Sequence, residues 1–147
     1  MLLNFQKRFV RDVWLGTKRQ TIRAKGKGAH VPAVGDMAHC YTGLRTNACQ
    51  RIGVWPIIRV EALDMRIEQH VLRNVMLGGC DLDRRSLNAL AVRDGFATAS
   101  TMEDWFCSNH APGQFEGYVI SWDWIPVPGS VLVLPASKDV LVPGDEQ

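Results

Sequence analysis

One run of residues near the middle of the chain constrains the fold more than any other. It is CQRIGVWPIIRVEALDMRI, residues 49–67, and its Val and Ile side chains are β-branched and favour strands. Pro56 removes a backbone donor inside this run, so we expect a bulge or a sheet edge there. Two further stretches alternate as strands do, at residues 37–43 (MAHCYTG) and 115–124 (FEGYVISWDW). Together they predict a β-sheet at the centre of the molecule.

The segment before this sheet begins with a helical pattern. Apolar side chains recur at helical spacing over residues 5–15, with Asn4 as the candidate N-cap and Gly16 as the stop. KRQTIRA, residues 18–24, alternates like a strand, and KGKGAHVPAVGD, residues 25–36, is rich in turn-forming Gly and Pro. We therefore expect a helix, a strand and a loop in this order.

Two more helices are predicted after the long β-rich run. DLDRRSLNALAVRDGF, residues 81–96, carries one apolar helical face and ends at Gly95. STMEDWFCSNH, residues 100–110, predicts a short helix that opens with a capping box. Two pairs fit that box: Ser100 with Glu103, or Thr101 with Asp104.

The order of these elements predicts the fold class. A helix, several strands, two helices and a closing strand make a small α+β domain, most simply a partly closed β-barrel with flanking helices. The length of 147 residues suits one domain, which we place at residues 1–124. Residues 125–147 contain four prolines and form an extension, either mobile or with an edge strand at SVLVL.

Composition excludes several classes of protein. The apolar fraction of 46% supplies a core and argues against intrinsic disorder. No run approaches the roughly 18 apolar residues that span a bilayer, and early charges at Lys7, Arg8 and Arg11 interrupt any signal-peptide core. We therefore expect a soluble, cytoplasmic protein with no membrane partner. The four cysteines form no C-x-x-C pair, so we expect reduced thiols and no metal or other cofactor.

Charge is distributed unevenly along the chain. Residues 1–59 carry a net charge of +9 and residues 60–147 a net charge of −7. One positive face would favour a phosphate-bearing partner such as RNA. Lys25 and Lys27, in the Gly-rich loop, are the natural phosphate contacts. The alternative is that the two halves interleave in space and their charges mix.

Lys18 and Thr21 are the first candidates for chemistry. A lysine beside a threonine hydroxyl accepts its proton when neutral and stabilises an oxyanion when charged, and nearby Arg23 would lower the lysine pKa. Strand alternation would place the two side chains on opposite faces. They meet only if Gly16 turns the chain so that Lys18 precedes the strand. The alternative is a solvated lysine and a strand-forming threonine.

The loop after the strand at 37–43 offers a second set of polar groups. Arg45, Thr46 and Asn47 supply a forked cation, a hydroxyl and an amide, which suit phosphate or carboxylate. Tyr41 offers a ring on which a base can stack. The alternative is a hairpin turn with a structural arginine. Ser121, on the last predicted strand, is a further candidate to face a cleft.

Asp94 is the third candidate. It lies at the end of a predicted helix, where the helix dipole disfavours a carboxylate. It could orient Lys18 or act as a general acid or base. The alternative is an aspartate that binds nearby backbone amides in a helix-stop turn.

Five sequence blocks together resemble the ASCH domain, a member of the PUA-like β-barrel superfamily. In chain order they are GTKRQTIR at 16–23, GD at 35–36, YTGLRTNAC at 41–49, DGF at 94–96 followed by MEDWF, and FEGYVISW at 115–122. The resemblance covers residues 3–124 and implies a PUA-like barrel with a cleft near its first helix–strand junction. PUA-like domains commonly bind RNA.

The resemblance also implies an activity. Small stand-alone ASCH proteins include amidohydrolases that remove the acyl group of N4-acetylcytidine with a threonine, a lysine and a glutamate. The first two correspond to Thr21 and Lys18, and Asp94 stands nearest to the glutamate, one methylene shorter. Other ASCH proteins have been proposed to cleave RNA, and the corresponding residues here are Tyr41 and Ser121.

Three hypotheses therefore stay open at this point. The first is a hydrolase of acylated nucleosides, in which Arg23 or Arg45 holds the substrate. The second is a non-catalytic RNA-binding module. The third is a metal-independent ribonuclease, although Asn47 stands where a lysine often lies in such proteins. The oligomeric state does not follow from the sequence.

Overall fold

We analysed a computed structural model, which describes residues 1–28 and 30–126. Within these residues it contains seven strands and three helices. In chain order they are β1 (Leu2–Phe5), α1 (Lys7–Leu15), β2 (Gln20–Ala24), β3 (Met37–Thr42), β4 (Gln50–Glu68), β5 (Val71–Leu77), β6 (Cys80–Asp81), α2 (Arg84–Arg93), α3 (Ala99–Asn109) and β7 (Gly113–Trp122). The predicted α+β class is confirmed. The expected SVLVL strand lies outside the described residues.

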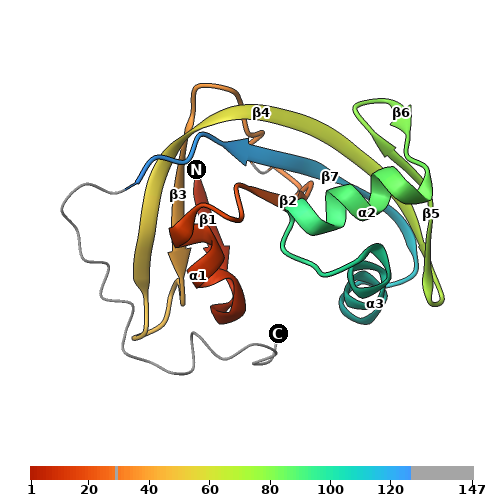
Figure 1. The fold of residues 1–147 in the computed structure, drawn as a ribbon, viewed down its shortest axis with the longest axis horizontal. Coiled ribbons are helices and arrows are strands. Elements are labelled where there is room, and N and C mark those ends of the chain that lie inside the picture. The colour runs from red at the N-terminus through yellow and green to blue at the C-terminus, as the bar shows by residue number, and fades with distance from the viewer. Residues whose placement is uncertain (29, 127–147) are drawn as a thin grey trace.

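Strand β4 is the central strand of the sheet and pairs with three others. Its first part pairs with β3, its later part pairs with β5, and β7 runs antiparallel along it from Ile57 to Ile67. The strand order β1-β3-β4-β5-β6, with β2 attached through β7, leaves the sheet open rather than closed. Figure 1 shows β4 arching over the molecule, with the helices beneath the arch. This open, curved sheet is consistent with part of a barrel.

The irregularity expected at Pro56 is confirmed. Pro56 forms the last pair between β4 and β3, opposite Met37. The register between β4 and β7 then shifts between Ile57 and Arg59. The missing donor of proline thus falls where β4 leaves one partner and joins the next.

The N-terminal prediction was wrong at its start. The helix begins at Lys7, because Leu2–Phe5 forms strand β1 parallel to β3. Its N-cap is Gln6, whose side chain makes no capping bond. Asn4 is therefore no cap, and its Oδ1 accepts instead from the Leu44 amide at 3.0 Å.

Two further local predictions need correction. The capping box of α3 uses Thr98 with Thr101, so neither predicted pair forms it. Strands β5 and β6 were not anticipated from the sequence. Helix α2 ends as expected, with Asp94 as its C-cap before Gly95.

The buried apolar residues form two separate clusters. The first, which we call the α1 core, packs α1 against β1, β3 and the early part of β4. The second, the α2–α3 core, packs the other two helices against β5 and the late part of β4. Strand β7 contributes to both. In Figure 1 α1 lies on one side of β2, and α2 and α3 lie on the other.

Candidate functional site

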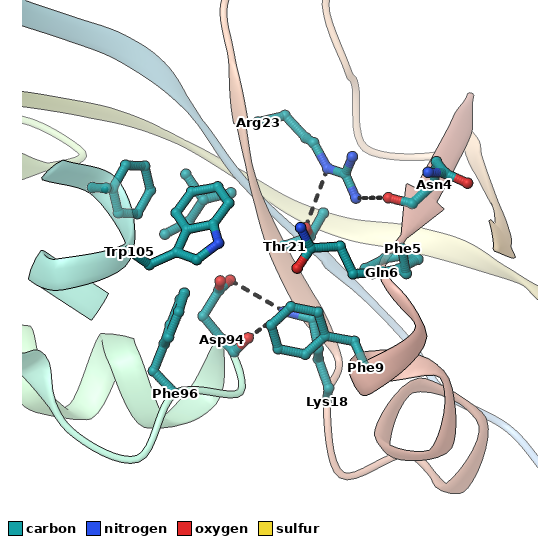
Figure 2. A pocket seen from close by; sticks show the side chains of 12 residues that line it. Asn4, Phe5, Gln6, Phe9, Lys18, Thr21, Arg23, Asp94, Phe96 and Trp105 are labelled. Atoms are coloured by element: carbon teal, nitrogen blue, oxygen red, sulfur yellow. Dashed lines mark hydrogen bonds and ion pairs between the residues drawn. The ribbon is translucent and has the colours of Figure 1, made fainter. Parts of the chain in front are cut away.

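A cavity of about 180 Å³ lies where the two cores face each other. It is smaller than the roughly 300–1,000 Å³ of pockets for drug-sized ligands, so it suits a compact group such as one planar ring or an acylated amine. Five aromatic side chains line it: Phe5, Phe9, Phe96, Trp105 and Phe106. Polar side chains from four segments complete the wall: Asn4, Gln6, Lys18, Thr21, Arg23 and Asp94 (Figure 2).

The turn after α1 delivers Lys18 to this cavity. Gly16 is left-handed with φ 82°, and the ring of Trp124 would lie 2.4 Å from any Cβ there. The amides of Thr17 and Lys18 both donate to the Asp12 carbonyl at 2.9 and 3.0 Å. Lys18 thus precedes β2, which begins at Gln20. The geometric condition for Lys18 and Thr21 to share a site is met.

The end of α2 delivers Asp94 to the same place. Its backbone amide still donates to the Leu90 carbonyl, and Gly95 follows in the left-handed region with φ 100°. A Cβ on Gly95 would lie 2.7 Å from Cε1 of Phe9, so only glycine allows this close approach. The turn sets Asp94 against a lysine 76 residues earlier in the chain.

Lys18 and Asp94 form a buried ion pair. Nζ of Lys18 lies 3.5 Å from Oδ1 of Asp94 and also donates to the Asp94 backbone carbonyl. The two residues are only 2% and 6% exposed. Figure 2 shows both contacts from Lys18 as dashed lines. The two acceptors hold the amine in one orientation at the wall of the cavity.

Burial opposes the charge on both partners. It lowers the pKa of Lys18 below its ordinary value of 10.5; the Asp94 carboxylate raises that pKa, and the Arg23 charge lowers it again. Burial also raises the pKa of Asp94 above its ordinary 3.8, although Lys18 acts in the opposite direction. A lysine whose pKa is lowered can lose its proton and serve as a base.

Thr21 lines the same cavity as the ion pair, and its hydroxyl accepts a hydrogen bond from Arg23. The two residues are two apart in β2, so their side chains leave the same face of the strand. Nε of Arg23 donates to the Thr21 hydroxyl at 3.2 Å, and its other nitrogen donates to the Asn4 carbonyl at 2.7 Å. Because the hydroxyl accepts from a cation, its own proton stays available and a developing negative charge on it is stabilised.

Gln20 is a contributor that the sequence did not indicate. Its Nε2 lies 3.5 Å from Oδ1 of Asp94, and its Oε1 accepts from Nε of Arg93 at 3.3 Å. It supports the carboxylate from the side away from the cavity. A neutral amide carries neither charge nor nucleophilicity, the two properties that distinguish Lys18, Thr21 and Arg23 in the sequence.

The loop at 43–49 does not line the cavity. Arg45, Thr46 and Asn47 are exposed, and the Thr46 hydroxyl donates to the Gly43 carbonyl at 2.7 Å within the turn. These contacts match the structural alternative, a turn between β3 and β4. Tyr41 is half-buried and is absent from the lining.

The remaining candidates also lie apart from the cavity. Lys25 and Lys27 are exposed on the Gly-rich loop that follows Arg23. Ser121 is buried, pairs with Gln20 across the sheet, and lines a separate hollow. The structure therefore brings Lys18, Thr21, Arg23 and Asp94 together, and leaves the others outside.

The five aromatic side chains of the cavity, together with Asn4 and Gln6, were not predicted as site residues. Phe5, Phe9 and Phe96 fit core positions by spacing, and in sequence nothing distinguishes a core ring from a cavity ring. Gln6 and Trp105 carry no charge that would draw attention. These side chains line one cavity only because α1, α2 and α3 pack close to one another.

No family model, no curated protein and no solved structure matches the chain in comparisons with known proteins. Among residues 1–28 and 30–126, no three His, Cys, Asp or Glu side chains gather closely enough to hold a metal ion. Within the same part of the chain, no helix is long and apolar enough to cross a membrane.

Proposed function

We propose that this cavity hydrolyses the amide bond of an N-acylated nucleoside, of which N4-acetylcytidine is the prototype, and that the chain is an ASCH-like member of the PUA-like superfamily. One observation carries the proposal. A lysine whose pKa burial has lowered, its carboxylate partner and a threonine hydroxyl line the same cavity. The five aromatic rings of that cavity suit a planar base.

The proposed reaction uses Thr21 as the nucleophile and Lys18 as the general base and general acid. Oγ of Thr21 attacks the carbonyl carbon, its proton passes to neutral Lys18, and the carbonyl electron pair moves onto oxygen. When the intermediate collapses, the C–N bond breaks and Lys18 returns the proton to the leaving amine. Water then attacks the acyl-threonine ester, Lys18 takes the water proton, and a carboxylic acid leaves as Thr21 is restored.

Asp94 and Arg23 prepare these steps. Asp94 accepts two hydrogens of the Lys18 amine, which leaves the nitrogen lone pair for the hydroxyl proton. Arg23 stabilises negative charge on Thr21 through the bond at 3.2 Å. Aspartate is sufficient in place of glutamate here, because the Gly95 turn brings its backbone against Lys18.

Turnover of N4-acetylcytidine to cytidine and acetate, followed by liquid chromatography, tests the proposal. We expect Thr21→Ala to lower kcat by at least about 10³-fold, and Thr21→Ser to retain part of it because a hydroxyl remains. Lys18→Met should lose about 10²–10⁴-fold, with Lys7→Met, at an exposed position of α1, as the control. Wild-type protein that leaves the substrate intact, or equal turnover by Thr21→Ala, refutes the proposal.

A second candidate function is RNA binding, favoured by the exposed lysines of the loop directly after Arg23. Each phosphate contact to single-stranded RNA contributes about 0.7 to the slope of log affinity against log salt. Replacing Lys25 and Lys27 by alanine should reduce that slope by about 1.4. Arg85→Ala, on an exposed site of α2, is the control that should leave it unchanged. Binding that does not respond to salt argues against this function.

A further inference from the structure

Two buried polar atoms in the cavity are not used by the steps above. Nε1 of Trp105 and Oε1 of Gln6 are shielded from solvent, and neither has a hydrogen-bond partner among the described residues. Both residues line the cavity. A buried indole N–H normally finds an acceptor, and a buried polar atom without a partner requires an explanation.

The Trp105 indole packs among three other rings. Its ring lies 5.0 Å from Phe106 and 5.7 Å from His110, both edge-on, and 6.2 Å from Phe96. These contacts fix the direction of its N–H bond. A donor that is fixed before the reaction needs no reorganisation when charge develops beside it.

The Gln6 side chain reaches the cavity from the start of α1. It occupies the N-cap position of α1, where a side chain usually bonds the helix amides, yet it makes no such bond. Its side chain instead lines the cavity, as Thr21 does (Figure 2). Gln6 thus offers an acceptor on the α1 side, and Trp105 offers a donor on the α3 side.

The two atoms match the two ends of a secondary amide. In a trans amide the C=O and N–H bonds point in opposite directions from one planar unit. Figure 2 shows Trp105 on the α3 side of β2 and Gln6 on the α1 side, and Thr21 on β2 lines the same cavity. An amide lying across the cavity would direct its oxygen to the indole and its N–H to the glutamine, and present its carbon to Thr21.

We propose that Trp105 is a catalytic residue whose N–H binds the developing oxyanion, and that Gln6 selects secondary amides by accepting the substrate N–H. This inference rests on the proposed function. As Thr21 attacks, the C=O bond becomes a C–O⁻ single bond and its hydrogen bond to the indole strengthens. A tertiary amide has no N–H, so it cannot form this hydrogen bond to Gln6.

Site-specific replacement of Trp105 by benzothienylalanine tests the first part, because this residue keeps the bicyclic shape and lacks the N–H. Loss of one oxyanion donor should lower kcat by about 10²–10³-fold and leave KM nearly unchanged. Trp105→Phe is the second variant, with folding checked by thermal melting. The same replacement at Trp122 is the matched control, since its indole N–H is also buried without a described partner but lies outside the cavity.

The second part is tested with Gln6→Met and two substrates. The variant should lose about ten-fold or more in kcat/KM for N4-acetylcytidine. It should lose little for N4-acetyl-N4-methylcytidine, which has no amide hydrogen. Equal losses on both substrates would overturn the selective role of Gln6.

The outcomes separate this inference from the function on which it rests. Turnover that needs Thr21 but survives loss of the Trp105 N–H overturns the oxyanion role alone. Absence of turnover in the wild-type protein overturns both proposals. Turnover that needs Thr21 and falls in kcat, not KM, on loss of the indole N–H supports both.

Discussion

Removing one charge of the Lys18–Asp94 pair should destabilise the fold strongly. In Asp94→Asn the Lys18 ammonium stays buried, at 2% exposure, without its counter-charge 3.5 Å away. Two unit charges at this distance attract by about 5 kcal/mol at an effective dielectric constant near 20. Breaking a buried pair on one side typically costs about 3–5 kcal/mol. We expect Asp94→Asn to lower the free energy of unfolding by about 3 kcal/mol or more at neutral pH.

The size of this loss should depend on pH in a defined direction. Burial holds the pKa of folded Lys18 below 10.5, and Asp94 raises that pKa, so removing the carboxylate lowers it further. Between the lowered folded pKa and 10.5, the unfolded chain binds more protons than the folded chain. Stability therefore rises with pH in this window. The deficit of Asp94→Asn should shrink as pH rises, because neutral Lys18 needs no partner.

Urea denaturation at several pH values measures both effects. Lys18→Met should remove the rise with pH, and the double variant should be more stable than the sum of the single losses predicts, since no unpaired charge remains. An unchanged m-value is the check that the transition stays two-state. A loss below about 1 kcal/mol for Asp94→Asn, or a deficit that grows with pH, would refute the buried-pair reasoning.

Three shorter predictions follow from the same structure. Gly95→Ala should lose about 1–3 kcal/mol of stability and most of the proposed hydrolase activity. The φ of 100° disfavours alanine, and its Cβ would lie 2.7 Å from Phe9, so the Asp94 turn must move. Unchanged melting and turnover would contradict this. The kcat/KM for N4-acetylcytidine should rise with pH as Lys18 loses its proton, with a midpoint below 10.5, and a flat profile would exclude it as the base. Burial raises the pKa of Cys40 to about 12, so a thiol reagent should modify it only after unfolding, whereas the exposed thiols, Cys49 and Cys80, should react in the native protein.

Much of the sheet follows from local sequence because its signals are local. Strands β3, β4 and β7 and the C-terminal end of α2 lie where residue type, alternation and helix-stop signals place them. Strand β1 does not, because Leu2–Phe5 is equally compatible with the helical spacing that follows it. Its state is decided by parallel pairing with β3, some 37 residues away, and no local pattern records that pairing.

The candidate site also combines features set by local sequence with features set by long-range packing. Glycine marks both the turn at Gly16 and the helix end at Gly95, and these are local sequence signals. The sequence therefore predicts that Lys18 can meet Thr21 if the chain turns at Gly16. Whether Asp94 joins them depends on how the α1 core docks against the α2–α3 core, which is a long-range event. The sequence does not indicate Gln6 or Trp105 as site residues, because they share a cavity only after the two cores have docked.

This arrangement also limits how the site can change. Each core supplies half of the cavity, and β2 and β7 join the halves. A shift of α1 relative to α2 would separate Lys18 from Asp94 and Gln6 from Trp105 at once, so docking and chemistry are coupled. Phe9 sits at this junction, with its ring 6.2 Å from Phe96 and 4.7 Å from Nζ of Lys18. A smaller side chain at Phe9 would loosen both the docking and the lysine, and should therefore reduce stability and turnover together, unlike the indole replacement at Trp105.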